Sequence, residues 1–255
     1  MVKYKNQIEK YRMTYDIHTH TTFSHGKGTI EDNVKEAVTK GLTTIGISDH
    51  GPGHLTYGVK RKKFSLMRKE IQRLEPIYPQ INILLGVEAN IINPSGKLDI
   101  HNEEWDYFDY VIAGYHYGIL GEKPLHAIKI HTINYCSSRW VKNREIKQKR
   151  INTDLVVKAL YENNIKVLTH PGDKGQFDLL EIAKACVATN TLMEISNWHE
   201  APLVEGLKEC AKTDVSFIIS SDAHLPKRVG TFSKGLQRAF EAGIDPERIV
   251  NIEEI

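Results

Sequence analysis

Short apolar runs alternate with amphipathic stretches along most of the chain. The apolar runs predict seven strands, at residues 15–20, 43–50, 81–90, 110–116, 166–172, 191–197 and 216–224. The stretches between them have helical spacing and predict helices at 29–41, 65–79, 152–164, 178–190, 202–214 and 232–243. The first helix has clear ends: Thr29 suits an N-cap, Asp32 suits the third helical position, and Gly41 suits the C-terminal turn.

Strands that are continuously apolar indicate burial on both faces, as in a parallel sheet. Strands followed by helices indicate an α/β fold. The chain has 255 residues, which is normal for one α/β barrel. We therefore expect a single domain over 1–255, folded as a distorted seven-stranded (β/α)7 TIM-like barrel.

Residues 119–150 interrupt this alternation. The segment is basic, contains Trp140 and the run "KNREIKQKR", and has no clear periodicity. A solvated insertion with a short helix is one interpretation. A lid, or a surface that contacts an anionic substrate or another subunit, is the alternative.

Charge, cysteine content and the length of the apolar runs indicate which kinds of binding partner and which cell compartment to expect. The formal net charge is +2, so the total charge does not demand nucleic acid or an anionic membrane. The three cysteines, at 136, 186 and 210, have no metal-binding spacing and no disulfide pattern. No apolar run has the length of a membrane span, and the first ten residues do not resemble a signal peptide. We expect a cytoplasmic protein that acts without a membrane.

Nearly every predicted strand ends in a side chain that can bind a metal. These residues are His18, His20, Asp49, His50, Glu88, His116, His170, Glu194, Asp222 and His224. The carboxyl ends of barrel strands open onto one face, so residues far apart in the sequence would meet there. His18 and His20 are two residues apart, so on a strand they point the same way, and a metal ion between them explains the spacing. His25 follows within the same short segment.

Other polar residues have weaker assignments. The remaining histidines, apart from His25, are His54, His101, His126, His131 and His199. Of these, His54 lies near enough to the predicted site to contact substrate, and His199 is expected to have no ligand role. Arg228, just beyond the last strand-end residues, is a candidate phosphate contact. Asp49 either supports a ligand histidine or caps a turn, and Glu194 either reaches the site or is buried against a basic partner.

The motifs "DIHTHTTFSHG", "ISDHG", "GVEANI", "VIAGYH", "LTHPG" and "ISSDAH", in this order, resemble the PHP (polymerase and histidinol phosphatase) family. The phrases "GVEANI", "VIAGYH" and "PERIVNI" resemble most closely the small stand-alone bacterial phosphatases of that family. The resemblance covers roughly residues 15 to 252. It implies a distorted seven-stranded β/α barrel, as the strand count also predicts.

The resemblance implies three divalent metal ions. His18, His20 and Asp222 would bind the first, and Glu88 would bridge the first and second. His116 and His170 would complete the second site, and the third would be held by His25, His50 and His224. Catalysis would depend on Glu88, Asp222 and His224. Histidine and carboxylate ligands suit zinc, with manganese or iron as alternatives.

These features favour hydrolysis of small phosphate monoesters by a metal-bound hydroxide. A histidinol-phosphate phosphatase and a PHP-type 3'-5' exonuclease or phosphodiesterase are the alternatives, and nucleic acid is the less favoured substrate. A non-catalytic metal-binding module would have lost ligands, and none is missing. An amidohydrolase also uses paired histidines on a barrel, but His25, His50 and His224 argue against it. Whether the protein forms a homo-oligomer stays open.

Overall fold

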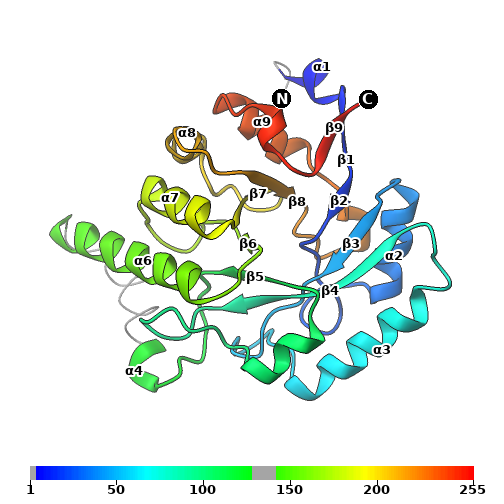
Figure 1. Cartoon of the computed structure of the whole chain (residues 1–255), viewed down its shortest axis with the longest axis horizontal. Helices are drawn as coiled ribbons and strands as arrows, with labels where there is room; N and C mark the ends of the chain where they lie inside the picture. Colours follow the sequence, from blue (N-terminus) through cyan, green and yellow to red (C-terminus); the bar gives the residue numbers. More distant parts are fainter. Residues whose placement is uncertain (1–3, 128–141) are drawn as a thin grey trace.

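Seven parallel strands form the centre of the molecule. The computed structural model describes residues 4–127 and 142–255. The sheet order follows the chain, from β2 to β8. Its strands are β2 (Tyr15–Asp16), β3 (Thr44–Ile47), β4 (Asn82–Asn90), β5 (Tyr110–Gly114), β6 (Val167–Leu168), β7 (Leu192–Ser196) and β8 (Phe217–Ser220). The predicted seven-stranded α/β barrel is confirmed, and Figure 1 shows the strands arranged around a common centre.

The two edge strands, β2 and β8, approach each other and almost close the sheet. Just beyond them Thr19 forms a parallel bridge with Ala223, and the amide of His20 donates to the Ala223 carbonyl at 2.9 Å. The buried carboxylate of Asp16 accepts hydrogen bonds from the amides of Ser221 at 3.3 Å and Gly230 at 2.9 Å. Residues that follow the first and last barrel strands are therefore brought together.

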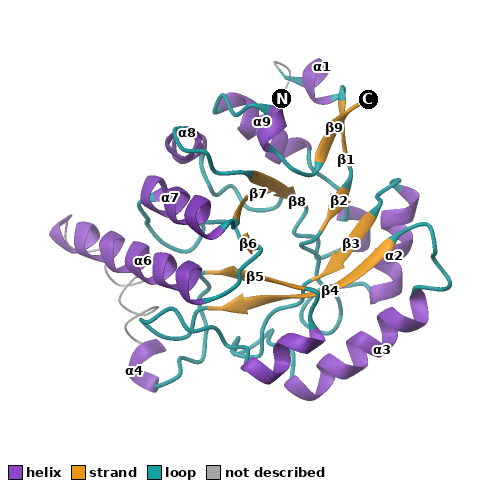
Figure 2. Cartoon of the chain, viewed as in Figure 1, coloured by secondary structure: helices purple, strands orange, loops and turns teal. Residues whose placement is uncertain are grey.

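The helices lie outside the ring of strands (Figure 2). The longer ones are α2 (Ile30–Thr39), α3 (Phe64–Leu74), α6 (Lys142–Glu162), α7 (Leu179–Thr189), α8 (Val204–Ala211) and α9 (Ser233–Glu241). The short elements are α1 (Lys5–Ile8), α4 (Pro124–Ala127), η1 (Arg61–Lys63), η2 (Asn102–Tyr107), η4 (Pro226–Arg228) and η5 (Pro246–Arg248). The predicted cap of α2 is confirmed, because Thr29 and Asp32 form a capping box.

Two segments differ from the expected pattern. α6 begins at Lys142, so the end of the predicted 119–150 insertion is the first part of a barrel helix. Residues 128–141 of that insertion lie outside the described residues. The chain ends also pair, because β1 (Tyr11–Met13) and β9 (Ile252–Glu254) form a separate antiparallel sheet. In Figure 1 both termini lie on the same side of the molecule, next to this pair.

Two apolar cores hold the barrel. The larger one lies between strands and helices, and the smaller one consists of Ile17, Ile112, Val167 and Ile218. Tyr110 packs against this smaller core, and its hydroxyl donates to the Ile17 carbonyl at 2.7 Å. Any side chain at Gly46 or Gly86 would collide with the Tyr110 ring, so these strand positions require glycine.

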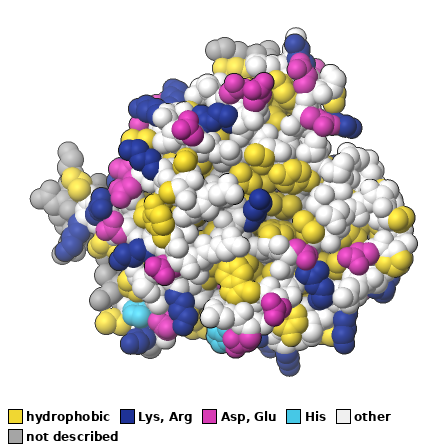
Figure 3. All heavy atoms as spheres, in the orientation of Figure 1, with side chains coloured by type: hydrophobic (Ala, Val, Ile, Leu, Met, Phe, Trp, Pro, Cys, Tyr) yellow, Lys and Arg dark blue, Asp and Glu magenta, His cyan; other side chains and the backbone are white. Residues whose placement is uncertain are grey.

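The surface carries charges of both signs. On the face drawn in Figure 3, Lys and Arg side chains alternate with Asp and Glu around the margin, while hydrophobic side chains gather toward the middle. Within residues 4–127 and 142–255, no helix is both long and apolar enough to span a bilayer.

Candidate metal centre

Residues that follow the barrel strands converge on one cleft. His18 and His20 come after β2, His50 after β3, His116 after β5, His170 after β6, and Asp222 and His224 after β8, while Glu88 lies in β4. The cleft has a volume of about 430 Å³, and all of these residues except His18 line it. Seven of these eight side chains are buried, and His224 is partly buried. The expectation that strand ends would bring distant residues together is met by this geometry.

Glu88 lies at the centre of the cluster and is fully buried. Its Oε1 is 3.1 Å from the Nε2 atoms of His116 and of His170, and 3.4 Å from His18 Nε2. Its Oε2 is 2.8 Å from His50 Nδ1. His20 Nε2 also lies 3.7 Å from Oε2. The two carboxylate oxygens therefore face different sets of histidines, and a carboxylate placed in this way can contact more than one ion.

Asp222 supplies a second buried carboxylate. Its Oδ1 lies 3.2 Å from His20 Nε2 and 3.7 Å from His18 Nε2. The Nε2 atoms of His18 and His20 are themselves 3.2 Å apart. Asp222 and His170 have left-handed backbones, with φ of 50° and 27°. Such conformations are unfavourable for residues other than glycine and often occur at functional sites.

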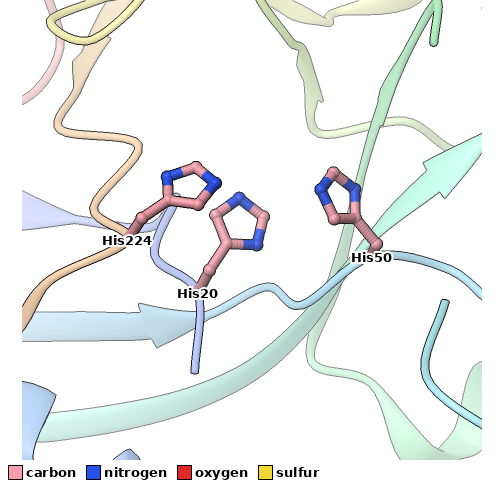
Figure 4. A group of neighbouring side chains, drawn as sticks. All are labelled: His20, His50 and His224. Atoms are coloured by element: carbon pink, nitrogen blue, oxygen red, sulfur yellow. The ribbon is translucent and has the colours of Figure 1, made fainter. Parts of the chain in front are cut away.

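A third group consists of His25, His50 and His224. The His25 ring centroid lies 4.9 Å from that of His50 and 4.2 Å from that of His224. The His20 ring stands close to two of them, at 4.7 Å from His50 and 4.5 Å from His224. Figure 4 shows His20, His50 and His224 as close neighbours that come from three different segments of the chain.

Asp49 holds the loop that carries His25. Its carboxylate accepts hydrogen bonds from the Thr21 amide at 2.8 Å and the Thr21 hydroxyl at 2.5 Å, and also from the Ser24 hydroxyl. The loop turns back on itself, since the Gly26 amide donates to the Thr21 carbonyl at 2.9 Å. Of the two roles open for Asp49, the contacts fit the turn-capping one.

The buried polar atoms of this cluster fit divalent cations. Several are enclosed and have no hydrogen-bond partner: His20 Nδ1, His25 Nδ1, His50 Nδ1, Glu88 Oε2, Asp222 Oδ1 and Asp222 Oδ2. Leaving a buried polar atom without a partner costs about 1–3 kcal/mol, so a native fold rarely concentrates them. Donor atoms that lie close together without hydrogen-bond alignment are the arrangement that shared ions require. Imidazole and carboxylate donors suit zinc, manganese or iron.

The charges of His20, His25 and Glu88 agree with this interpretation. At His18, burial lowers the pKa, but the carboxylates of Glu194, Asp222 and Glu88 outweigh it and raise that pKa well above its usual value. Burial lowers the pKa of His20 well below its ordinary value, and burial with neighbouring His224 and His50 lowers that of His25 to about 3. Both rings are therefore neutral, the form that binds a metal. Burial raises the pKa of Glu88, but the surrounding histidines more than offset this and hold it well below its usual range. Glu88 is thus an anion ready to bind cations.

Three hydrogen bonds orient rings of the candidate ligands. His18 Nδ1 lies 2.6 Å from Glu194 Oε1, and His116 Nδ1 lies 2.8 Å from the side-chain oxygen of Asn90. His224 Nδ1 lies 2.9 Å from the Asp222 carbonyl. Because each acceptor holds the proton on Nδ1, the Nε2 atom is left to bind a metal. Glu194 is fully buried and does not line the cleft, so it influences the site by orienting the His18 ring.

Glu194→Gln should therefore weaken metal binding without removing a ligand. Glu194 also accepts a hydrogen bond from the His170 amide at 2.7 Å, so it supports two candidate ligands at once. A glutamine retains one acceptor and loses the charge. Changes of this kind cost roughly 10–100-fold in metal affinity, which chelator competition measures. Glu205→Gln, at a side chain that is 84% exposed, is the control. Equal affinities in the two variants would contradict the role of Glu194.

Of the two residues expected to contact substrate, His54 lines the cleft and Arg228 does not. The His54 ring lies 5.2 Å from the His50 ring. The Arg228 guanidinium stands 4.1 Å from the centre of the Trp198 ring, and Trp198 lines the cleft next to His224. Arg228 is thus connected to the cleft by its contact with Trp198, which lines it.

Sequence reasoning missed four residues of the site. The sequence predicts no ligand role for His199, but its Nε2 lies 3.2 Å from Asp222 Oδ2. Lys174 and Tyr57 line the cleft, and Asn90 orients His116. The position of Asn90 in β4, two residues after Glu88, was the only signal for any of them, since alternate strand residues share a face.

Comparison with known proteins agrees with the fold and the motifs. A model of the PHP domain matches residues 16–203. A "probable phosphatase" of Shewanella sediminis is 26% identical over 92% of this chain and 88% of its own length. The "probable phosphatase YcdX" of Escherichia coli is 26% identical over 93% and 89%. A similar fold is found in the crystal structure of histidinol phosphate phosphatase from Lactococcus lactis, complexed with zinc, L-histidinol and phosphate. The two structures superpose with a TM-score of 0.60 at 18% sequence identity, and the match covers 91% of this chain and 95% of that one. The chain belongs to the PHP domain family.

Proposed function

We propose that the protein is a metal-dependent phosphatase that hydrolyses small phosphate monoesters at a site for three divalent metal ions. The observation that carries the proposal is the convergence of unpartnered buried nitrogen and oxygen atoms around Glu88 and Asp222. The names of the relatives, both "probable phosphatase", support the same reaction class.

The distances support the assignment of ligands made from the family motifs. His18, His20 and Asp222 form one group, in which all the donor-atom distances lie between 3.2 and 3.7 Å. Glu88 joins this group to His116 and His170, each 3.1 Å from its Oε1. The remaining group is His25, His50 and His224, whose rings lie together. Zinc is the ion we favour, with manganese or iron as alternatives.

The bound ions would polarise a phosphoryl oxygen and lower the pKa of water toward neutrality. The chain's own residues position the reaction. Glu194 and Asn90 keep protons on Nδ1 of His18 and His116, so that the opposite nitrogens face the ions. Lys174 lines the cleft and would attract an anionic ester, and we propose Arg228 and His54 as further substrate contacts.

The size of the cleft supports a small substrate. Its volume of about 430 Å³ lies within the ordinary range for small-molecule sites, roughly 300–1,000 Å³. Tyr57 and Trp198 form apolar walls beside the histidines. A small phosphorylated molecule fits this space, and it offers terminal oxygens that can contact more than one cation.

We also propose that one domain carries the activity, because the ligand residues extend from the end of β2 to the end of β8. The described cysteines, Cys186 and Cys210, are buried free thiols. They fit the reducing cytoplasm expected from the sequence.

The substrate class is tested by a direct comparison of rates. We expect faster hydrolysis of para-nitrophenyl phosphate than of its bis ester or of short single-stranded DNA, with zinc and again with manganese. Histidinol phosphate is measured in the same series. A rate on histidinol phosphate far above the generic monoester would assign the chain to that substrate instead.

Glu205→Gln is the matched control for protein quality, because its side chain is highly exposed. Faster cleavage of the bis ester or of DNA with both metals would refute the monoesterase proposal.

A further inference from the structure

His199 is placed in the cleft by a turn at the end of β7. The strand ends at Ser196, which is fully buried. The Ser196 hydroxyl accepts hydrogen bonds from the amides of Trp198 at 3.1 Å and His199 at 3.0 Å. This turn brings the imidazole to the cleft lining, three residues after the strand rather than directly at its end.

Asp173 holds one side of the His199 ring. Its Oδ1 lies 3.1 Å from His199 Nδ1, and its Oδ2 lies 2.5 Å from Lys174 Nζ. Asp173 itself belongs to the turn after β6, where its amide donates to the His170 carbonyl at 3.1 Å. A carboxylate on Nδ1 fixes the ring so that Nε2 points the other way, as in carboxylate–histidine–metal arrangements.

The free side of the ring faces the second oxygen of Asp222. His199 Nε2 lies 3.2 Å from Asp222 Oδ2, which is buried and has no aligned hydrogen bond. His20 Nε2 stands at the same 3.2 Å from Asp222 Oδ1, again without an aligned hydrogen bond. Two donor atoms that share one ion are about 3 to 3.5 Å apart when each is about 2.0–2.2 Å from it. His199 thus relates to one oxygen of Asp222 as His20 relates to the other.

A third ligand atom lies close enough to complete the group. The rings of His170 and His199 have centroids 4.6 Å apart. One donor atom each from His170, His199 and Asp222 lie within 4.8 Å of one another. Donors from residues that follow β6, β7 and β8 therefore meet beside Asp222, and of these three residues the family motifs assign only His199 to no ion.

We propose that His199, positioned by Asp173, is an additional ligand of the metal centre and binds a divalent cation through Nε2 together with Asp222 Oδ2 and His170. The inference rests on the metal centre of the proposed function but not on its reaction. It adds a nitrogen donor beyond the nine residues assigned from the motifs. The extra donor would hold the ion more tightly.

The test measures metal binding directly. His199→Ala should weaken the binding of at least one zinc ion by about 10-fold or more in chelator competition, since even changes beyond the direct ligands cost roughly 10–100-fold. It should also change the visible spectrum of the cobalt-substituted protein, because a nitrogen donor is lost. Asp173→Asn should give a smaller shift in the same direction. His101→Ala, at an imidazole that is 53% exposed, is the matched control and should match wild type.

Circular dichroism of the metal-free proteins checks that each variant folds. If His199→Ala does not fold, Asp173→Asn is the milder substitution that still tests the proposal. Wild-type zinc affinity and an unchanged cobalt spectrum in the folded variants would overturn the proposal, even if their turnover fell. If wild type binds zinc but hydrolyses no phosphate ester, the proposed function fails, while the loss of affinity in His199→Ala would still establish the ligand.

Discussion

Replacing Glu88 with glutamine is expected to abolish turnover while leaving the barrel folded. Glutamine has the same shape, so the apolar packing around β4 is preserved. The substitution removes the charge and one of the two oxygens available to cations. Glu88 Oε1 faces His116 and His170, and Oε2 faces His50, so no other residue can take over both contacts.

The loss should exceed the effect of a supporting residue such as Glu194. Substituting a residue that only orients a ligand lowers metal affinity or activity by roughly 10–100-fold. Substituting a residue that joins two ions should therefore lower kcat by more than about 100-fold. The rate on para-nitrophenyl phosphate and the metal content by mass spectrometry are the measurements. His18→Ala and His170→Ala should be similarly damaging, because each removes a donor atom. Full activity of Glu88→Gln would rule out the bridging role.

Most of the barrel could be predicted because its strands are buried on both faces and therefore leave continuous apolar runs. The ends of those strands could not be placed from the pattern. The run at 15–20 forms a strand only over Tyr15–Asp16, since the chain then turns to bridge Ala223. The β1–β9 pair left no local signal, because it joins two short segments from opposite ends of the chain.

The site followed from one physical rule, that parallel strands end on a common face. That rule brought in Glu88 and Asp222 but missed His199, which reaches the cleft through a turn set by Ser196. It left Glu194 ambiguous, because a strand-end carboxylate can either bind a metal or orient a ligand. The 2.6 Å contact with His18 and the hydrogen bond from the His170 amide distinguish the two.

Removing the metals should abolish turnover and lower the melting temperature. An ion that binds only the folded chain stabilises it by about 2.7 kcal/mol at a free concentration 100 times its dissociation constant. For a domain of this size, each kcal/mol shifts the melting temperature by about 2–4 °C, so one well-filled site corresponds to roughly 5–10 °C. Chelation would leave Glu88 Oε2 and both Asp222 oxygens buried without partners, which is the physical reason for the loss.

The experiment is a thermal scan and a rate measurement before chelation, after it, and after zinc, manganese or iron is added back. Activity and melting temperature should fall together and recover together, and the ion that restores both at the lowest concentration identifies the preferred metal. Glu88→Gln should show a smaller shift on chelation than wild type, because it holds less metal at the start. Full turnover by chelated protein with no measurable metal would exclude a metal-dependent reaction. A fall in melting temperature alone, with no recovery of turnover by any ion, would make the metals structural.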